Sequence, residues 1–315
     1  MPIAVLTAGE SMARLLGPAA TRLRHAAALE LGVGGAESNV AIGLSRLGHR
    51  AAWFSRLGDD EAGKLVLNRL RGEGVETGGV KIVGHAPTGL FLRERAPEGA
   101  RGHYYRAGSA ASTMTPEDID TALLGQARIL HVTGITPALS DSCASFAREL
   151  IRAARGLDLL VSLDVNFRSR FCSAEWLRDW VEGVLPETDV VFASAEEAEA
   201  LWPDAGEELL DRLGQAGPRE IILKGDGGDT LAWSADGVER APLVEGVTPI
   251  DTVGAGDAFA AGYLDGWLRG LSIRQRLVQG NAMGALCVMG VGDYEALPDR
   301  RTLDAFVAGT KDLGR

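Results

Sequence analysis

Residues 251–259 read DTVGAGDAF, and this stretch is the strongest feature of the sequence. An aromatic residue recurs at every fourth position from there on, at Phe259, Tyr263 and Trp267, which is the spacing of one helix face. The segment therefore predicts a glycine-rich turn followed by a helix that starts near Ala258.

The predicted turn has the features of a phosphate-binding site. Gly254 and Gly256 let the backbone turn tightly and approach a ligand closely. The amides of Ala255, Gly256 and Asp257 are expected to point outward at the helix N-terminus, where phosphate binds favourably. A carboxylate at this point can accept the proton of an alcohol that attacks the phosphate. The alternative is that Asp257 is an ordinary N-cap.

The composition limits the class of protein. The 315 residues suffice for one large domain with an insertion or for two domains, and 46% of them are apolar. The net charge is −11 and no long basic run occurs, so nucleic acid is not an expected partner. No run of about 18 apolar residues occurs, so we expect no membrane span. The isolated Cys143, Cys172 and Cys287, and an N-terminus without signal-peptide features, predict a cytoplasmic protein.

Short apolar runs rich in β-branched residues alternate with longer helical patterns. This alternation indicates an α/β protein with a mostly parallel sheet and helices on both faces. We predict strands at residues 3–7, 50–56, 129–133, 159–165, 189–192 and 220–224. We predict helices at residues 37–47 and 62–72, and a further helix capped by Ser140 or Asp141.

Two segments interrupt the alternation, residues 12–33 and 88–110. They read as short strands joined by turns, at 12–16, 29–33, 89–95 and 103–106. We predict that they meet as a small, discontinuous β-sheet lid, and simple edge hairpins are the alternative. The remaining residues, 1–11, 34–87 and 111–315, would form the α/β core.

A second motif, GGAESN at residues 34–39, opens the first predicted helix. Gly34 and Gly35 permit close approach of a ligand, and Asn39 offers a donor and acceptors to sugar hydroxyls, although a plain helix start would look similar. GGAESNVA and LSRLG near the N-terminus, with DTVGAGDAF near the C-terminus, resemble the two signatures of the PfkB (ribokinase-like) carbohydrate kinases. The resemblance covers essentially the whole chain.

The resemblance implies a ribokinase-like fold, with a three-layer αβα core and a small β-sheet lid. It implies ATP-dependent phosphorylation of a sugar hydroxyl, with Asp257 as the general base and with Gly254, Ala255 and Gly256 as the anion hole. ATP brings Mg²⁺ with it. Whether a monovalent cation is a further cofactor is left open by the resemblance.

Further residues correspond to the nucleotide side of this family. Lys224, Gly225 and Gly227 belong to a glycine-rich loop after a predicted strand. Asn281 lies on the late helix that usually borders the adenine.

The metal site departs from the family pattern. The family often carries Asn-x-x-Glu after the central strand, with roles in holding Mg²⁺ through water. Here Glu197 matches the glutamate, whereas Ser194 replaces the asparagine. We therefore expect Glu197 to contact the metal through water and Ser194 to lie near the nucleotide.

Four segments look like the branch of the family that phosphorylates 2-keto-3-deoxygluconate. They read YYRAGSA, HVTGITPALS, SLDVNFR and GDYE, at residues 104–110, 131–140, 162–168 and 292–295. The substrate of this branch is a sugar acid, and its carboxylate has to be neutralised in the site.

Two arginines are the candidates for this task. Arg106 lies on the predicted lid, and Arg168 lies just past the carboxyl end of a strand, where α/β proteins bind ligands. Two guanidinium groups can hold a carboxylate with paired hydrogen bonds, and solvated or salt-bridged arginines are the alternative. We expect Tyr104 to contact the sugar, and packing within the lid is the alternative. Asp293 either binds a substrate hydroxyl or is a polar residue of a turn, and Phe91 stands where the branch suggests a tyrosine.

Two rival functions are compatible with the same residues. One is a PfkB kinase for a neutral sugar such as fructose or ribose, or for a nucleoside. The other is a regulator that binds sugar or nucleotide without catalysis, which the intact Asp257 and its glycines argue against. As partners we expect a sugar acid, ATP and further copies of the chain, with the lid as the candidate dimer surface.

Overall fold

Eight strands form the central sheet of the structure, a computed structural model that describes residues 2–204, 206–225 and 228–309. The strand order is β14-β13-β12-β11-β10-β9-β1-β4. Neighbouring strands from β12 to β4 run parallel, whereas β13 pairs antiparallel with both of its neighbours. The strands are β1 (Ile3–Ala8), β4 (Ala51–Phe54), β9 (Ala127–Thr133), β10 (Leu160–Asp164), β11 (Val190–Ser194), β12 (Glu220–Lys224), β13 (Thr230–Ser234) and β14 (Gly237–Ala241).

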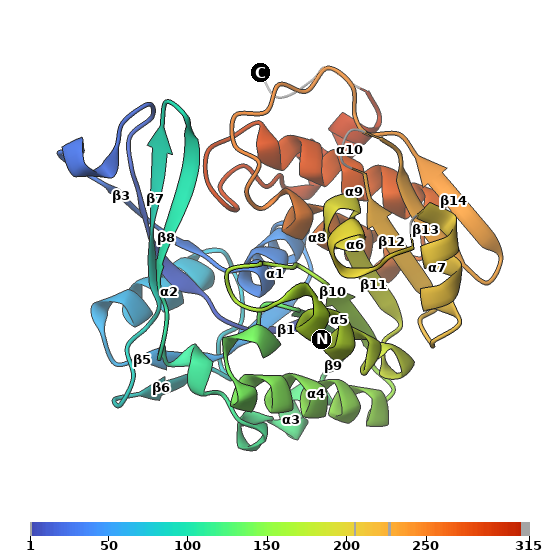
Figure 1. The fold of residues 1–315 in the computed structure, drawn as a ribbon, viewed down its shortest axis with the longest axis horizontal. Coiled ribbons are helices and arrows are strands. Elements are labelled where there is room, and N and C mark those ends of the chain that lie inside the picture. The colour runs from blue at the N-terminus through green and yellow to red at the C-terminus, as the bar shows by residue number, and fades with distance from the viewer. Residues whose placement is uncertain (1, 205, 226–227, 310–315) are drawn as a thin grey trace.

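Helices cover both faces of this sheet (Figure 1). Successive side chains of a strand point to opposite faces, so the adjacent Val5 and Leu6 belong to two different apolar clusters. The cluster of Val5 includes side chains of α1 (Ala36–Arg46), α2 (Glu61–Gly72), α8 (Ala255–Leu268), α9 (Ile273–Val288) and α10 (Arg300–Val307). The cluster of Leu6 includes side chains of α3 (Thr121–Leu124), α4 (Asp141–Gly156), α5 (Ala174–Glu182), α6 (Ala195–Leu201) and α7 (Gly206–Gly214). The predicted three-layer αβα core is therefore confirmed.

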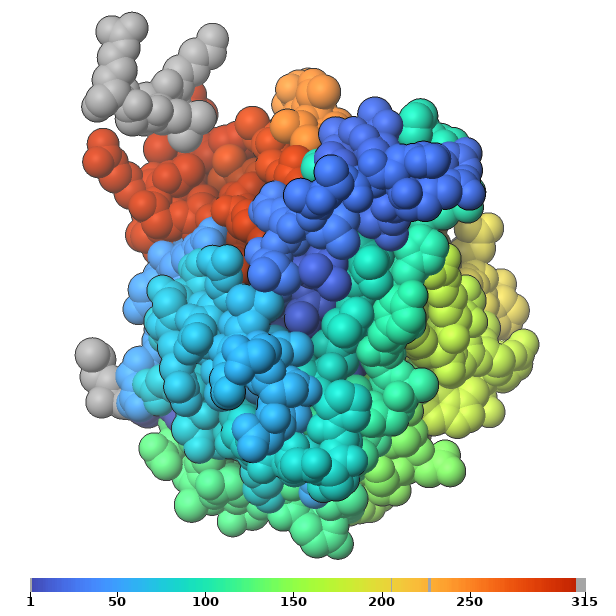
Figure 2. All heavy atoms as spheres, turned by 90° about the vertical axis from the view of Figure 1, so that its left-hand side faces the viewer, coloured from blue at the N-terminus to red at the C-terminus, as the bar shows by residue number. Residues whose placement is uncertain are grey.

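A second sheet stands at one edge of the core, on the left in Figure 1. Its order is β3-β2-β7-β8, with strands β2 (Met12–Leu16), β3 (Glu30–Gly34), β7 (Leu90–Ala96) and β8 (Gly99–Tyr105). The two middle strands, β2 and β7, are parallel, and the outer pairs are antiparallel. Residues 12–33 and 88–110 thus meet in one sheet, as the sequence predicted, and we call this sheet the lid. Figure 2 looks onto the lid side of the molecule.

Most predicted elements agree with the structure to within two residues at each end, and three either differ by more or are divided. The strand predicted at 50–56 is divided into β4 and β5 (Arg56–Gly58), and β5 pairs with β6 (Lys81–Val83) in a separate two-stranded sheet. The strand predicted at 103–106 begins earlier, at Gly99, and ends before Arg106. The helix predicted from Ala258 begins at Ala255. Among the helices in the described ranges, none is long and apolar enough to cross a membrane.

The parallel strands end on polar residues at one edge of the sheet. Asp164 ends β10, Ser194 ends β11 and Lys224 ends β12. Ligands of open α/β sheets bind outside this carboxyl edge. Ser194 and Lys224 line a cleft at this edge.

Candidate active site

The N-terminus of α8 forms the floor of the site. Gly254 is its N-cap, with φ +81°, a left-handed conformation that favours glycine. The first intrahelical hydrogen bond runs from the Ala258 amide to the Gly254 carbonyl oxygen, at 2.8 Å. The amides of Gly256 and Asp257 therefore lie in the first turn, where helix geometry provides no backbone acceptor. The interpretation of Asp257 as an N-cap was wrong, because the helix begins two residues before it.

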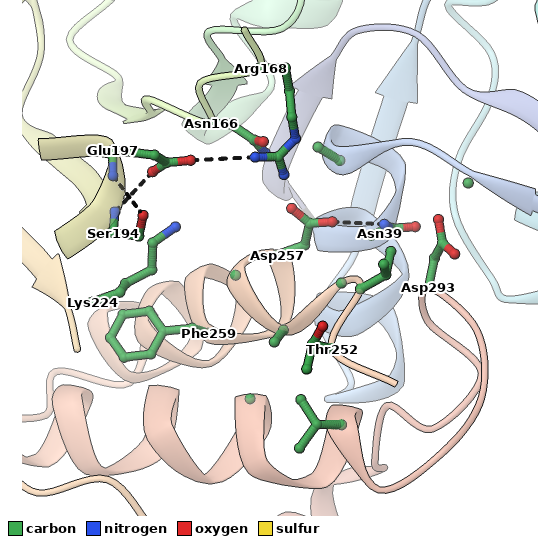
Figure 3. A pocket seen from close by; sticks show the side chains of 18 of the residues that line it. Asn39, Asn166, Arg168, Ser194, Glu197, Lys224, Thr252, Asp257, Phe259 and Asp293 are labelled. Atoms are coloured by element: carbon green, nitrogen blue, oxygen red, sulfur yellow. Dashed lines mark hydrogen bonds and ion pairs between the residues drawn. The ribbon is translucent and has the colours of Figure 1, made fainter. Parts of the chain in front are cut away.

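The Asp257 carboxyl lies in the first turn of α8 and faces the cleft (Figure 3). Asn39 Nδ2 donates a hydrogen bond of 2.7 Å to Asp257 Oδ2. Burial raises the pKa of Asp257 from 3.8 to about 7, and the negative charge of Asp164 acts in the same direction. The Asn39 hydrogen bond and the charges of Lys224 and Arg168 partly offset this rise.

Lys224 brings a positive charge next to Asp257. Its Nζ lies 2.8 Å and 3.0 Å from the two carboxylate oxygens of Asp164. Burial lowers the pKa of Lys224, but nearby carboxylates, Asp164 foremost, outweigh it and raise the pKa overall. A Cβ on Gly256 would lie 3.3 Å from Lys224 Nζ, so the ammonium group also borders the predicted anion hole.

One cleft of about 1030 Å³ contains the predicted site residues. It is lined by all of those that the structure describes: Gly34, Gly35, Asn39, Phe91, Tyr104, Arg106, Arg168, Ser194, Glu197, Lys224, Gly225, Gly254, Ala255, Gly256, Asp257, Asn281 and Asp293. The predicted Gly227 lies outside the described residues. The structure thus brings together residues that lie up to 259 positions apart in the chain, from Gly34 to Asp293.

On the nucleotide side, several predicted residues also have structural partners. Ser194 and Glu197 form a capping box at the start of α6, in which each side chain accepts the backbone N–H of the other residue. The Asn281 amide donates 2.9 Å to the Pro242 carbonyl and accepts from Thr230 Oγ1 at 2.8 Å. Apolar side chains complete this end of the cleft, namely Leu243, Val244, Val247, Pro249 and Val288.

On the lid side, the two predicted arginines lie in different environments. Arg106 is buried, forms an ion pair with Glu10, and lies over the Phe171 ring at 4.5 Å. The Arg168 side chain is 55% exposed, and its Nη1 lies 3.6 Å from Glu197 Oε1 (Figure 3). Glu10 therefore already neutralises Arg106, whereas Arg168 can turn toward a ligand.

The aromatic residues of the lid pack on each other. The rings of Phe91 and Tyr104 stack with centroids 5.4 Å apart, and Tyr104 meets Phe171 edge-on at 5.9 Å. Phe91 is buried and Tyr104 is 43% exposed. This stack forms an aromatic wall of the cleft that carries one phenol hydroxyl.

Sequence reasoning missed several residues of the cleft. Asn166 lines the cleft, and Asp164 binds the cleft residue Lys224. Both lie in the quoted segment 162–168, and their position at or just after the end of β10 could have identified them. Asn166 has φ +42°, and its Oδ1 is buried without a hydrogen-bond partner in the described structure. Arg101 and Arg170 add two exposed guanidinium groups to the rim.

A set of charged side chains, also missed, lies where the lid meets the core, and all of its members except the exposed Glu295 are buried. Arg14 and Arg93 come from lid strands β2 and β7, and Asp251, Asp293 and Glu295 come from the loops before α8 and after α9. No local sequence pattern predicts these pairs, because the partners are 158 to 281 positions apart. We call this set the lid-root cluster.

The described residues contain no group of three or more His, Cys, Asp or Glu side chains that could hold a metal ion. Glu197 Oε2 is occupied by the capping box, and Oε1 faces Arg168 across the cleft. Oε1 is therefore the oxygen of Glu197 that remains available for the predicted contact to a metal through water.

A proton acceptor beside free helix amides and a lysine is what a small-molecule kinase requires. The family model for pfkB family carbohydrate kinases matches residues 4–300, and the chain belongs to this family.

Similar proteins include 2-dehydro-3-deoxygluconokinase from Bacillus subtilis (strain 168), which is 34% identical over 99% of this chain and 98% of its own length. The 2-dehydro-3-deoxygalactonokinase of Haloferax volcanii is 33% identical, over 91% of each chain. The crystal structure of a PfkB protein from Polaromonas sp. JS666 is 33% identical and superposes with a TM-score of 0.88, over 96% of this chain and 99% of that one.

Proposed function

We propose that the chain transfers the γ-phosphoryl group of ATP to a primary hydroxyl of 2-keto-3-deoxygluconate, with Asp257 as the general base. The observation that carries this proposal is the Asp257 carboxyl itself. Its pKa of about 7 is close to neutral pH, where a general base is most effective. It lies in the first turn of α8, whose residues Gly256 and Asp257 both line the cleft.

Each group around Asp257 has a task in this proposal. The Asn39 amide holds the carboxylate in one orientation through its 2.7 Å hydrogen bond. The amides of Gly256 and Asp257 donate to the oxygens of the phosphoryl group in flight. Lys224, fixed by Asp164, balances the negative charge that develops there.

ATP fits the rest of the cleft. The apolar residues Leu243, Val247 and Val288 provide a wall for a purine ring. Mg²⁺ arrives with ATP and supplies charge neutralisation on its phosphates, and Glu197 would contact it through water.

The sugar-acid assignment rests on positive charge at the rim. The chain as a whole carries −11, yet Arg101, Arg168 and Arg170 are exposed at the mouth of this one cleft. Arg170 Nη1 donates 2.8 Å to the Gly102 carbonyl of the lid, so it is oriented toward the cleft edge. A substrate carboxylate among these groups would be neutralised with paired hydrogen bonds.

One observation favours a neutral sugar as the second candidate substrate. The Arg106 charge is already matched by Glu10, and Ser109 Oγ donates a further hydrogen bond to that carboxylate. A sugar hydroxyl could then be bound by Asp293 and Asn39 without any role for the Arg106 guanidinium group.

An ATP-coupled assay over sugar acids and neutral sugars tests the proposal. Arg168→Ala should raise KM for the sugar acid about 10- to 100-fold and leave a neutral sugar within about 3-fold. Arg178→Ala, an exposed arginine paired with its neighbour Asp179 in α5, is the matched control. A wild type that phosphorylates fructose or ribose far better than any keto-deoxy acid would refute the substrate assignment.

Assembly, cation dependence and location complete the proposal. We propose a homo-oligomer that associates through the lid, where Leu31 and Tyr105 are 54% and 64% exposed. Light scattering of wild type and Leu31→Asp tests it.

Replacing K⁺ by tetramethylammonium in the activity assay tests whether the enzyme depends on a monovalent cation. The free cysteines of the described chain suit the reducing cytoplasm, where ATP is available.

A further inference from the structure

The lid-root cluster connects the lid to the turn that begins α8. Arg93 on β7 forms an ion pair with Asp251, and its Nη1 lies 3.6 Å from Asp293 Oδ1. Arg14 on β2 donates 3.0 Å to Asp293 and 2.5 Å to Glu295. Figure 2 shows the blue lid strands next to the red C-terminal segments on this side of the molecule.

Asp251 organises the backbone of the phosphate-binding turn. Its Oδ1 accepts the Val253 amide at 3.2 Å, and its Oδ2 accepts the Gly292 amide at 3.1 Å. One carboxylate thus fixes the turn before α8, the loop after α9 and a lid arginine at the same time.

The loop after α9 also contacts the N-cap residue of α8, Gly254. A Cβ built on Gly254 would lie 1.9 Å from the Asp293 carbonyl oxygen. The backbone of Asp293 and the N-cap of α8 are therefore in direct contact, and movement of one displaces the other.

The charges of this cluster are out of water. Arg14 and Arg93 are 0% and 6% exposed, and Asp251 and Asp293 are 8% and 5% exposed. Buried charges keep their partners, because an unpaired buried charge is strongly destabilising. Lid strands β2 and β7 and the turn at 251–254 are thus held as one unit.

We propose that Arg93 is a positioning residue for phosphoryl transfer, which seats the 251–254 turn against the lid and so places the amides at the start of α8. The proposal rests on the kinase activity proposed above, but not on the identity of the sugar. It can be tested with whichever sugar the wild type phosphorylates, so its failure is separate from failure of the sugar-acid assignment.

The experiment measures kcat, sugar KM and the melting temperature for wild type, Arg93→Gln, Arg93→Lys and Asp251→Asn. The matched control is Arg95→Gln, on the same strand, whose guanidinium binds the Gly17 carbonyl within the lid. Arg93→Gln should lower kcat about 10- to 100-fold, the range expected for a displacement of about 1 Å. Sugar KM should change less than about 3-fold, and Arg93→Lys should recover part of kcat.

The double variant Arg93→Gln/Asp251→Asn removes both charges. It leaves no unpaired buried charge from this pair, so the proposal can still be tested if a single variant misfolds. Its kcat should be no lower than that of the less active of the two single variants, because both changes break the same ion pair. Three results would each overturn the proposal: an unchanged kcat in folded Arg93→Gln, a raised sugar KM at constant kcat, or an equal kcat loss in Arg95→Gln.

Discussion

The pH dependence of turnover provides a direct test of Asp257 as the base. With a pKa of about 7, raised by burial, only about a tenth of the carboxyls are ionised at pH 6 and about nine tenths at pH 8. We therefore expect kcat/KM to fall about 10-fold from pH 8 to pH 6, and 10-fold per pH unit below that.

Substitutions of two neighbours of Asp257 should shift the low-pH fall of kcat/KM, which we call the acid limb, in opposite directions. Asn39→Ala removes the hydrogen bond that lowers the pKa, so the limb should move to higher pH. A hydrogen bond to a charged group contributes about 1.5 to 3 kcal/mol, which corresponds to about one to two pH units. Asp164→Asn removes a negative charge that raises the pKa, so the limb should move to lower pH.

The assay follows ADP formation from pH 5 to 9 by a method without coupling enzymes, because these have pH profiles of their own. The terminal phosphate of ATP also titrates near this range, but it does so equally for every variant. The difference between the two variants therefore isolates Asp257. Shifts in the same direction, or no shift in either folded variant, would refute the assignment of this carboxyl as the base.

Two further predictions concern stability. The folded pKa of Asp257 lies above its unfolded value of 3.8, so its ionisation opposes folding, and the stability present at low pH is lost as pH rises to about 7. Asp257→Asn should thus abolish turnover while increasing stability by about 4 kcal/mol at pH 8 and about 2 kcal/mol at pH 5; equal melting temperatures at pH 8 would contradict this. Gly254→Ala should cost more than the about 1–3 kcal/mol of backbone strain alone, because of the Asp293 contact, and Gly270→Ala, at φ +71° with no atom within 4 Å, is the control for strain. Equal losses in the two alanine variants, measured by denaturant unfolding, would contradict that reasoning.

Local patterns predicted most of the fold. Alternation of apolar runs and helical periodicity placed β12 at Glu220–Lys224 and the lid strand β2 at Met12–Leu16 without error. The helix start at Ala255 was missed by three residues, because a residue in a glycine-rich turn can belong to the turn or to the first helical turn.

Motifs likewise predicted residues that the structure brings together. Every described residue that was predicted for the site lines one cleft, because the carboxyl ends of parallel strands meet at one sheet edge. What the motifs could not provide was the state of each side chain. Arg106 looked like a free cation for a substrate, yet Glu10, 96 positions away in the sequence, already binds it.

The sequence by itself determined the α/β class, the kinase family and the carboxyl at the start of α8, because these depend on periodicity and on residues adjacent in the chain. Tertiary structure alone decided the pKa of Asp257, the Asp164–Lys224 pair and the lid-root cluster. The physical reason is that burial and charge pairing depend on distances in space, which are set only when distant segments pack together.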